Sequence, residues 1–108
     1  MLVCIIEFGT APGKEEENRA LVAELMIEAK KNDGFISKEG FTSRDNPGKI
    51  VTLSYWKSAE SLRDWMLNAE HRKGIVLGKK ELLSHYTIQI AEISSERSWT
   101  KPEGKISQ

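Results

Sequence analysis

The sequence predicts one α+β domain, in which two helices cover one face of a four-stranded antiparallel sheet. Three observations predict this fold class. The chain has 108 residues, which suits a single domain with one modest core. Four short stretches are rich in β-branched and aromatic residues, and other stretches repeat apolar residues with helical spacing. These stretches follow one another as βαββαβ over residues 1–93, and residues 94–108 form a polar tail.

The first strand is expected at residues 2–8 and the first helix at residues 14–32. The strand segment is apolar and rich in β-branched residues, and glycine and proline follow it. The helical segment has three glutamates in its first turn and apolar residues at i, i+4 and i+8, namely Leu21, Leu25 and Ala29. Gly34 is expected to end this helix as its C-terminal glycine.

A hairpin and a second helix are expected next. Residues 35–44 and 49–56 flank the sequence Asp-Asn-Pro-Gly, whose residue types favour a reversal of the chain. Ser58 is the expected N-cap of a helix whose apolar stripe consists of Leu62, Trp65, Met66 and Ala69. We expect this helix to bend or break at residues 71–74. A further helical stretch then leads to a fourth strand at residues 86–93.

Apolar side chains on both faces of the strands predict an interface. In the third expected strand, Ile50 and Trp56 point to one face, and Val51, Leu53 and Tyr55 point to the other. Two helices cover only one face of a four-stranded sheet, and a large exposed apolar patch is typical of an interface. We therefore expect a homodimer in which the two sheets pack face to face.

Composition argues against several kinds of partner. The 16 basic and 16 acidic residues cancel, so no excess charge favours nucleic acid or anionic lipid. The first apolar run is too short to span a bilayer and has no leader features, so we expect a cytoplasmic protein. The single cysteine, Cys4, excludes an intramolecular disulfide. Two histidines without metal-ligand spacing predict no metal site.

The segment VTLSYWKSAESLRDW, residues 51–65, resembles the antibiotic biosynthesis monooxygenase (ABM) superfamily. A strand that ends in Trp56 is followed by Ser58, an acidic residue and a helix with a second tryptophan, Trp65. The Gly-Phe pair at residues 34–35 and the last expected strand are similar to the same family, so the resemblance covers nearly all of the chain except the tail. It implies a ferredoxin-like fold that forms a dimeric α+β barrel, with a small pocket between helices and sheet.

The resemblance implies an O2-dependent monooxygenase that needs no cofactor and acts on a small aromatic or hydroquinone-like molecule. Such chemistry needs a pocket with little water, a base for a phenolic proton and donors that hold the resulting anion. By analogy with the polyketide-tailoring members, His71 would be the base and Trp65 an indole donor. These two residues share one pocket only if the helix breaks between them. Further candidates for substrate binding are Tyr55, Trp56 and His85.

Two other functions stay open at this point. In the haem-degrading members, a histidine ligates the iron and a helical tryptophan shapes the haem, which would assign His71 and Trp65 to those roles. The strand position at which those members have asparagine is Glu7 here, a further candidate for contact with a substrate. The third hypothesis is a dimeric small-molecule binder without turnover. Each candidate also has a structural interpretation: Trp65 as core, and His71 and His85 at the ends of elements.

Overall fold

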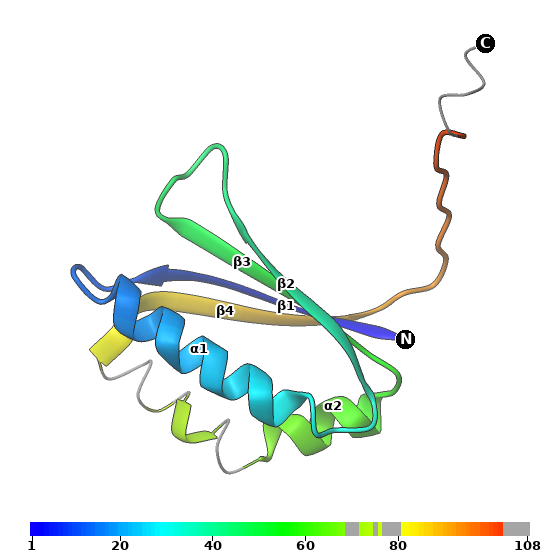
Figure 1. The fold of residues 1–108 in the computed structure, drawn as a ribbon, viewed down its shortest axis with the longest axis horizontal. Coiled ribbons are helices and arrows are strands. Elements are labelled where there is room, and N and C mark those ends of the chain that lie inside the picture. Colours follow the sequence, from blue (N-terminus) through cyan, green and yellow to red (C-terminus); the bar gives the residue numbers. More distant parts are fainter. Residues whose placement is uncertain (69–71, 75, 77–80, 103–108) are drawn as a thin grey trace.

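The computed structural model describes residues 1–68, 72–74, 76 and 81–102. Its elements are β1 (Leu2–Thr10), α1 (Glu15–Ala29), β2 (Phe35–Thr42), β3 (Lys49–Trp56), α2 (Ala59–Met66) and β4 (Leu83–Glu92). Both labelled helices lie on the same side of the sheet, and the chain after β4 leads away from it as a tail (Figure 1). The predicted order βαββαβ and the α+β fold class are confirmed.

One antiparallel sheet with the strand order β2-β3-β1-β4 supports the whole fold. The central strand β1 pairs with β3, where Cys4 lies opposite Ser54, and with β4, where Phe8 lies opposite Tyr86. Because β3 lies between β1 and β2, helix α1 connects two strands that are not neighbours. This split βαβ arrangement is the ferredoxin-like topology expected from the sequence. Among the described helices, none is long and apolar enough to cross a membrane.

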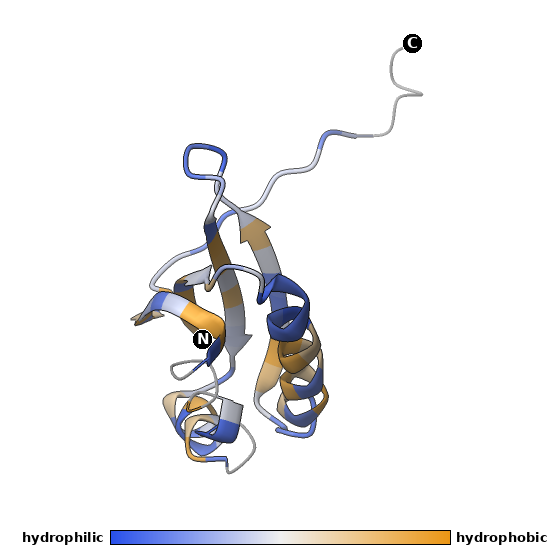
Figure 2. Cartoon of the chain, turned by 90° about the vertical axis from the view of Figure 1, so that its left-hand side faces the viewer, coloured by the Kyte–Doolittle hydropathy of each residue, from blue (hydrophilic) through white to orange (hydrophobic). Residues whose placement is uncertain are grey.

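The two faces of the sheet have different surroundings. Cys4, Ile6 and Phe8 of β1 face the helices, as do their partners on β3. The alternate residues Val51, Leu53 and Tyr55 therefore lie on the open face. The sequence indicated that they share one face but not which face the helices cover. Hydrophobic bands run along the strands in Figure 2. Phe41 of β2 lies opposite Val51 and is 45% exposed, so apolar residues of three strands meet on this open face.

Several elements end at residues other than the predicted ones. A bulge between Gly9 and Thr10 lets β1 and β4 continue their pairing to Leu83, so both strands are longer there than the alternating pattern indicated. Helix α2 ends at Met66, before the break expected at residues 71–74. Its cap, Leu67, precedes Asn68, which has a low helix propensity.

Gly34 does not have the role that the sequence predicted. Helix α1 ends with Lys30 in a right-handed conformation, and within the described residues only Gly13 has a positive φ, of 77°. A Cβ built on Gly34 would lie 2.2 Å from the Cβ and Oγ of Ser61, so glycine is needed for a close approach to α2. Asn32 fixes this approach, because its side chain donates to the Ser61 carbonyl at 3.0 Å and accepts from the Gly34 amide at 2.8 Å.

Ser58 caps α2, as the sequence predicted. Its Oγ accepts from the amide of Ser61 at 3.1 Å, and the Oγ of Ser61 accepts from the amide of Ser58 at 3.3 Å. This reciprocal capping box satisfies two amides at the start of the helix. It fixes the first turn of the helix that carries Leu62 and Trp65 into the core.

Candidate functional site

A cavity of about 130 Å³ lies between the helices and the helix-facing side of the sheet. Most of its lining is apolar, and the polar members come from α1 and the strands. An engineered apolar cavity of roughly 150 Å³ binds benzene, so this volume suits a ligand of about one ring. The lining residues from the sheet include Cys4, Ile6, Phe8, Phe35, Lys38, Thr52, Ser54, Trp56, Tyr86 and Ile88, and those from the helices include Asn18, Leu21, Val22, Leu25, Met26, Ala29, Trp65 and Met66.

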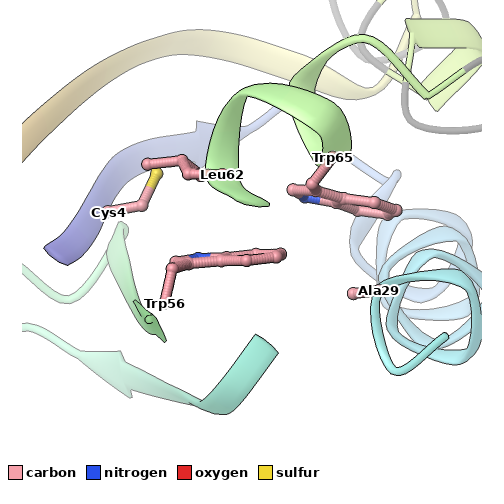
Figure 3. Packing of buried hydrophobic residues seen from close by; sticks show 5 residues of the cluster. All are labelled: Cys4, Ala29, Trp56, Leu62 and Trp65. Atoms are coloured by element: carbon pink, nitrogen blue, oxygen red, sulfur yellow. The ribbon is translucent and has the colours of Figure 1, made fainter. Parts of the chain in front are cut away.

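Two tryptophans form one wall of this cavity. Trp56 of β3 and Trp65 of α2 lie one above the other, with Ala29 of α1 beside them (Figure 3). Their ring centroids are 6.2 Å apart with an interplanar angle of 21°, and Phe35 meets Trp56 edge-on at 5.3 Å. Trp56 is 1% exposed and Trp65 is 9% exposed, so bulk water does not reach this wall from outside.

The hydroxyl of Ser54, which lies beside this wall, orients Trp56. The indole Nε1 of Trp56 donates to the Oγ of Ser54 at 2.9 Å. Burial raises the pKa of the Cys4 thiol, although a side-chain hydrogen bond with Ser54 opposes this shift. The buried Cys4 is therefore a neutral thiol at neutral pH.

Asn18 and Lys38 line the cavity although the sequence interpretation did not select them. Asn18 of α1 is 8% exposed, and its carboxamide makes no hydrogen bond within the described part of the chain. The signal for Asn18 was present in the sequence, because it precedes Leu21, Val22 and Leu25 at i+3, i+4 and i+7 and so lies on the apolar stripe. Lys38 projects from β2 on the face of Ser54, its pairing partner. Burial lowers the pKa of Lys38.

The predicted site residues divide into three groups. Trp56 and Trp65 are brought together in the cavity wall. Tyr55, Glu7 and His85 lie on the open face and do not line the cavity of their own chain. His71 lies outside the described residues. The sequence shows that neighbouring strand residues point to opposite faces, but only the packed helices decide which face holds the cavity.

The open-face residues have local partners of their own. The carboxylate of Glu7 pairs with Lys49 at 3.0 Å between Oε2 and Nζ. The Nδ1 of exposed His85 lies 3.0 Å from the Oγ of its neighbour Ser84. A Cβ built on Gly9 would lie 2.5 Å from the His85 ring, so Gly9 leaves room for that ring over β1. These contacts keep Glu7 and His85 on the side of the sheet that the helices leave uncovered.

Comparison with known proteins gives a family and related sequences. The family model described as antibiotic biosynthesis monooxygenase matches residues 1–76. Jasmonate monooxygenase ABM of Pyricularia oryzae is 26% identical over 95 residues, which are 88% of this chain and 44% of that protein. The chain thus spans less than half the length of this relative. The uncharacterized protein YqjZ of Bacillus subtilis is 24% identical over 91 residues, which are 83% of this chain and 78% of that protein.

Solved structures share the fold at low sequence identity. Rv0793 from Mycobacterium tuberculosis has a TM-score of 0.78 and 18% identity, with 90% of this chain and 98% of that chain covered. SnoaB, a cofactor-independent oxygenase from Streptomyces nogalater, has a TM-score of 0.76 and 10% identity, with 88% of this chain and 94% of that chain covered. At such identities the likeness establishes the fold alone.

Proposed function

Because the chain belongs to the antibiotic biosynthesis monooxygenase family, we propose that it is a dimeric monooxygenase that oxidises a small aromatic, hydroquinone-like molecule with O2. The proposed reaction uses no metal and no flavin. The observation that carries this proposal is the apolar cavity walled by Trp56 and Trp65, which has room for about one ring. The cofactor-independent oxygenase SnoaB and the jasmonate monooxygenase are relatives whose named activities support it.

The proposed chemistry needs few protein groups. A base removes a proton from a ring hydroxyl, and the electron-rich anion then reduces O2 itself. One oxygen atom enters the product and the other leaves as water, so that a hydroquinone becomes a hydroxyquinone. The substrate supplies all four electrons that O2 takes up, two through hydroxylation of the ring and two through oxidation of the hydroquinone to the quinone. The cavity contributes exclusion of water, orientation of the ring and hydrogen bonds to the anion.

Named residues are assigned to these tasks as part of the proposal. Trp65 packs against the substrate ring and serves as an indole donor to it. Asn18 has a buried carboxamide without a partner among the described residues, which suits a donor to a substrate oxygen. His71, which the sequence analysis selected as the base, retains that role in the proposal.

The dimer also belongs to the proposal. The open face has apolar residues on three of its four strands, β2, β3 and β1, including Phe41, Leu53 and Ile5. Packing of two such faces would remove this patch from water. It would also bury Tyr55, and it would place Glu7 and His85 at or near the subunit interface rather than in the cavity of their own chain.

Oxygen consumption tests the proposed function. The purified chain is incubated with a panel of hydroquinones and anthrones in buffer freed of metals and flavins, and dissolved O2 is followed. We expect saturable O2 uptake that is strongest with single-ring hydroquinones and that is lost in His71→Ala. His85→Asn is the matched control and keeps the activity, because His85 lies on the open face and does not line the cavity of its own chain. Failure of every substrate to accelerate O2 uptake would contradict the proposal.

The same panel separates the two rival functions. Haem and a reductant are added, and the Soret band is followed. Bleaching of that band by the wild-type chain would favour haem degradation. Absence of both O2 uptake and Soret bleaching would favour a small-molecule binder without turnover.

A further inference from the structure

Lys38 is the one charged side chain among the described residues that line the cavity. It lies on the edge strand β2, opposite Ser54 of β3, so its side chain enters the cavity wall from the side of the sheet. No described aspartate or glutamate lines the cavity. The ammonium group at the border of this apolar cavity therefore has no counter-ion among the described residues that line it.

Some of the cations elsewhere on the described surface form ion pairs. Four ion pairs engage Lys14, Arg19, Lys31 and Lys49 with nearby glutamates. Lys38 takes part in none of these pairs, and no hydrogen bond to its Nζ is found within the described residues. It is half-buried, and the loss of water around it lowers its pKa. Its position thus carries an energetic cost that no described protein group offsets.

A second polar group lies on the neighbouring rung of the sheet. Thr52 lines the cavity, is 8% exposed, and has a hydroxyl without a hydrogen-bond partner among the described side chains. Its pairing partner on β2 is Gly40, the next residue after Lys38 on the same face. A Cβ built on Gly40 would have Thr52 Cγ2 as its nearest neighbour, at 3.8 Å, so there is free space beside the Lys38 stem.

We propose that Lys38 and Thr52 form a subsite for an anionic oxygen of the ligand, so that the cavity selects a small ring compound with one negative charge. The ammonium pairs with a carboxylate or an ionised ring hydroxyl, and the Thr52 hydroxyl donates a second hydrogen bond. The ring lies in the apolar part of the cavity, toward Trp56 and Trp65. This assignment deepens the proposed function, on which it rests for the identity of the cavity as the substrate site.

A purely structural role for Lys38 makes a different prediction. Lysine stems cover apolar surface while the ammonium remains in water, and such a lysine has no preference for a charged ligand. Lys38→Met keeps most of the stem and removes the charge, so it separates the two roles. Lys38→Arg keeps the charge and tests rescue. Lys57→Met removes an equal charge from an exposed position just after β3 and serves as the matched control.

The test compares two isosteric probes, 4-fluorobenzoate and 4-fluorobenzamide, by fluorine NMR titration of the full chain at neutral pH. We expect the wild-type chain to bind the benzoate about tenfold more tightly than the benzamide. Lys38→Met should lose this preference while its benzamide affinity stays within about twofold of wild type. Lys38→Arg and Lys57→Met should keep the preference, and Thr52→Val should reduce it.

Three results would overturn the assignment. In the first, Lys38→Met prefers the benzoate as strongly as the wild-type chain does. In the other two, the wild-type chain binds both probes equally well, or it binds neither of them at millimolar concentration. The oxygen assay is independent of this titration. A benzoate preference that depends on Lys38, together with no O2 uptake from any substrate, would leave the subsite in place and reject the oxygenase. O2 uptake without a preference for the charged probe would reject the subsite alone.

Discussion

Trp56 and Trp65 stack on each other, yet they make different contributions to the site. Trp56 is held by its hydrogen bond to Ser54 and by the edge-on ring of Phe35, so it belongs to the framework of the cavity. Trp65 comes from a short helix whose start is fixed by the Ser58 capping box. The position of its indole therefore depends on a local hydrogen-bond arrangement, which couples the geometry of the cavity wall to the first turn of α2.

The half-buried ammonium of Lys38 should lower the stability of the folded chain. Its pKa is lowered in the folded chain, so the unfolded chain binds more protons between that lowered value and the ordinary value of 10.5. The free energy of unfolding therefore rises as the pH increases through that window. Below the window, the charged Lys38 destabilises the folded chain by its full amount. We expect Lys38→Met to raise the midpoint of thermal unfolding at neutral pH by a few degrees, which corresponds to about 1 kcal/mol or less for a domain of this size.

Calorimetry at several pH values checks this expectation. Lys57→Met, in which an exposed lysine is replaced, should leave the midpoint nearly unchanged. A lower midpoint for Lys38→Met than for the wild-type chain would mean that the ammonium has a stabilising partner.

At the scale of single residues, the sequence selected Trp56 and Trp65 as separate candidates but did not select the polar residues of the cavity. Trp65 lies on the apolar stripe of a helix, whereas the sequence did not show whether Trp56 or its neighbour Tyr55 faces the helices. Lys38 resembles an ordinary surface residue, and Asn18 lies on the apolar stripe of α1, but periodicity does not show whether an inward face meets a filled core or a cavity. Only the packed helices distinguish these two cases.

The contact between the α1–β2 loop and α2 depends on Gly34. Gly34→Ala would place a methyl group against the Cβ and Oγ of Ser61, so either the loop or α2 must move. We expect a loss of about 1 to 3 kcal/mol in the free energy of unfolding, measured by denaturant titration. Gly48→Ala is the matched control, since a Cβ there meets nothing within 4 Å, and it should stay within about 0.5 kcal/mol of wild type. Equal effects of the two variants would contradict the packing role of Gly34.

Elements with clear end signals could be predicted best. The bounds of β3 agree with the prediction, because Pro-Gly precedes this strand and the capping serine Ser58 follows it closely. The start of β4 was predicted three residues too late, because the bulge near Gly9 is a property of the paired strands rather than of either segment alone. Gly34 was assigned to a helix end for a similar reason, since its neighbour Ser61 is distant in sequence.

At the scale of the whole molecule, the open face should decide the oligomeric state. Leu53 lies on this face at the centre of β3, and a charge there would be buried if two sheets packed together. We expect a dimer for the wild-type chain and a folded monomer for Leu53→Glu in sedimentation velocity. Ile27→Glu, on the outer side of α1 where Ile27 is 63% exposed, is the matched control and should remain dimeric. A monomeric wild-type chain at working concentration would contradict the proposed assembly.

The three tryptophans allow the substrate site to be located directly. Trp56 and Trp65 line the cavity, whereas Trp99 is 79% exposed in the tail, so three indole N–H signals report on two separate places. The decisive measurement is a nitrogen–proton NMR titration with methylhydroquinone under argon, where no turnover occurs. We expect binding in the cavity to cause saturable shifts of the Trp56 and Trp65 signals and to leave the Trp99 signal stationary. Stationary Trp56 and Trp65 signals, at a concentration that supports O2 uptake in air, would contradict this expectation.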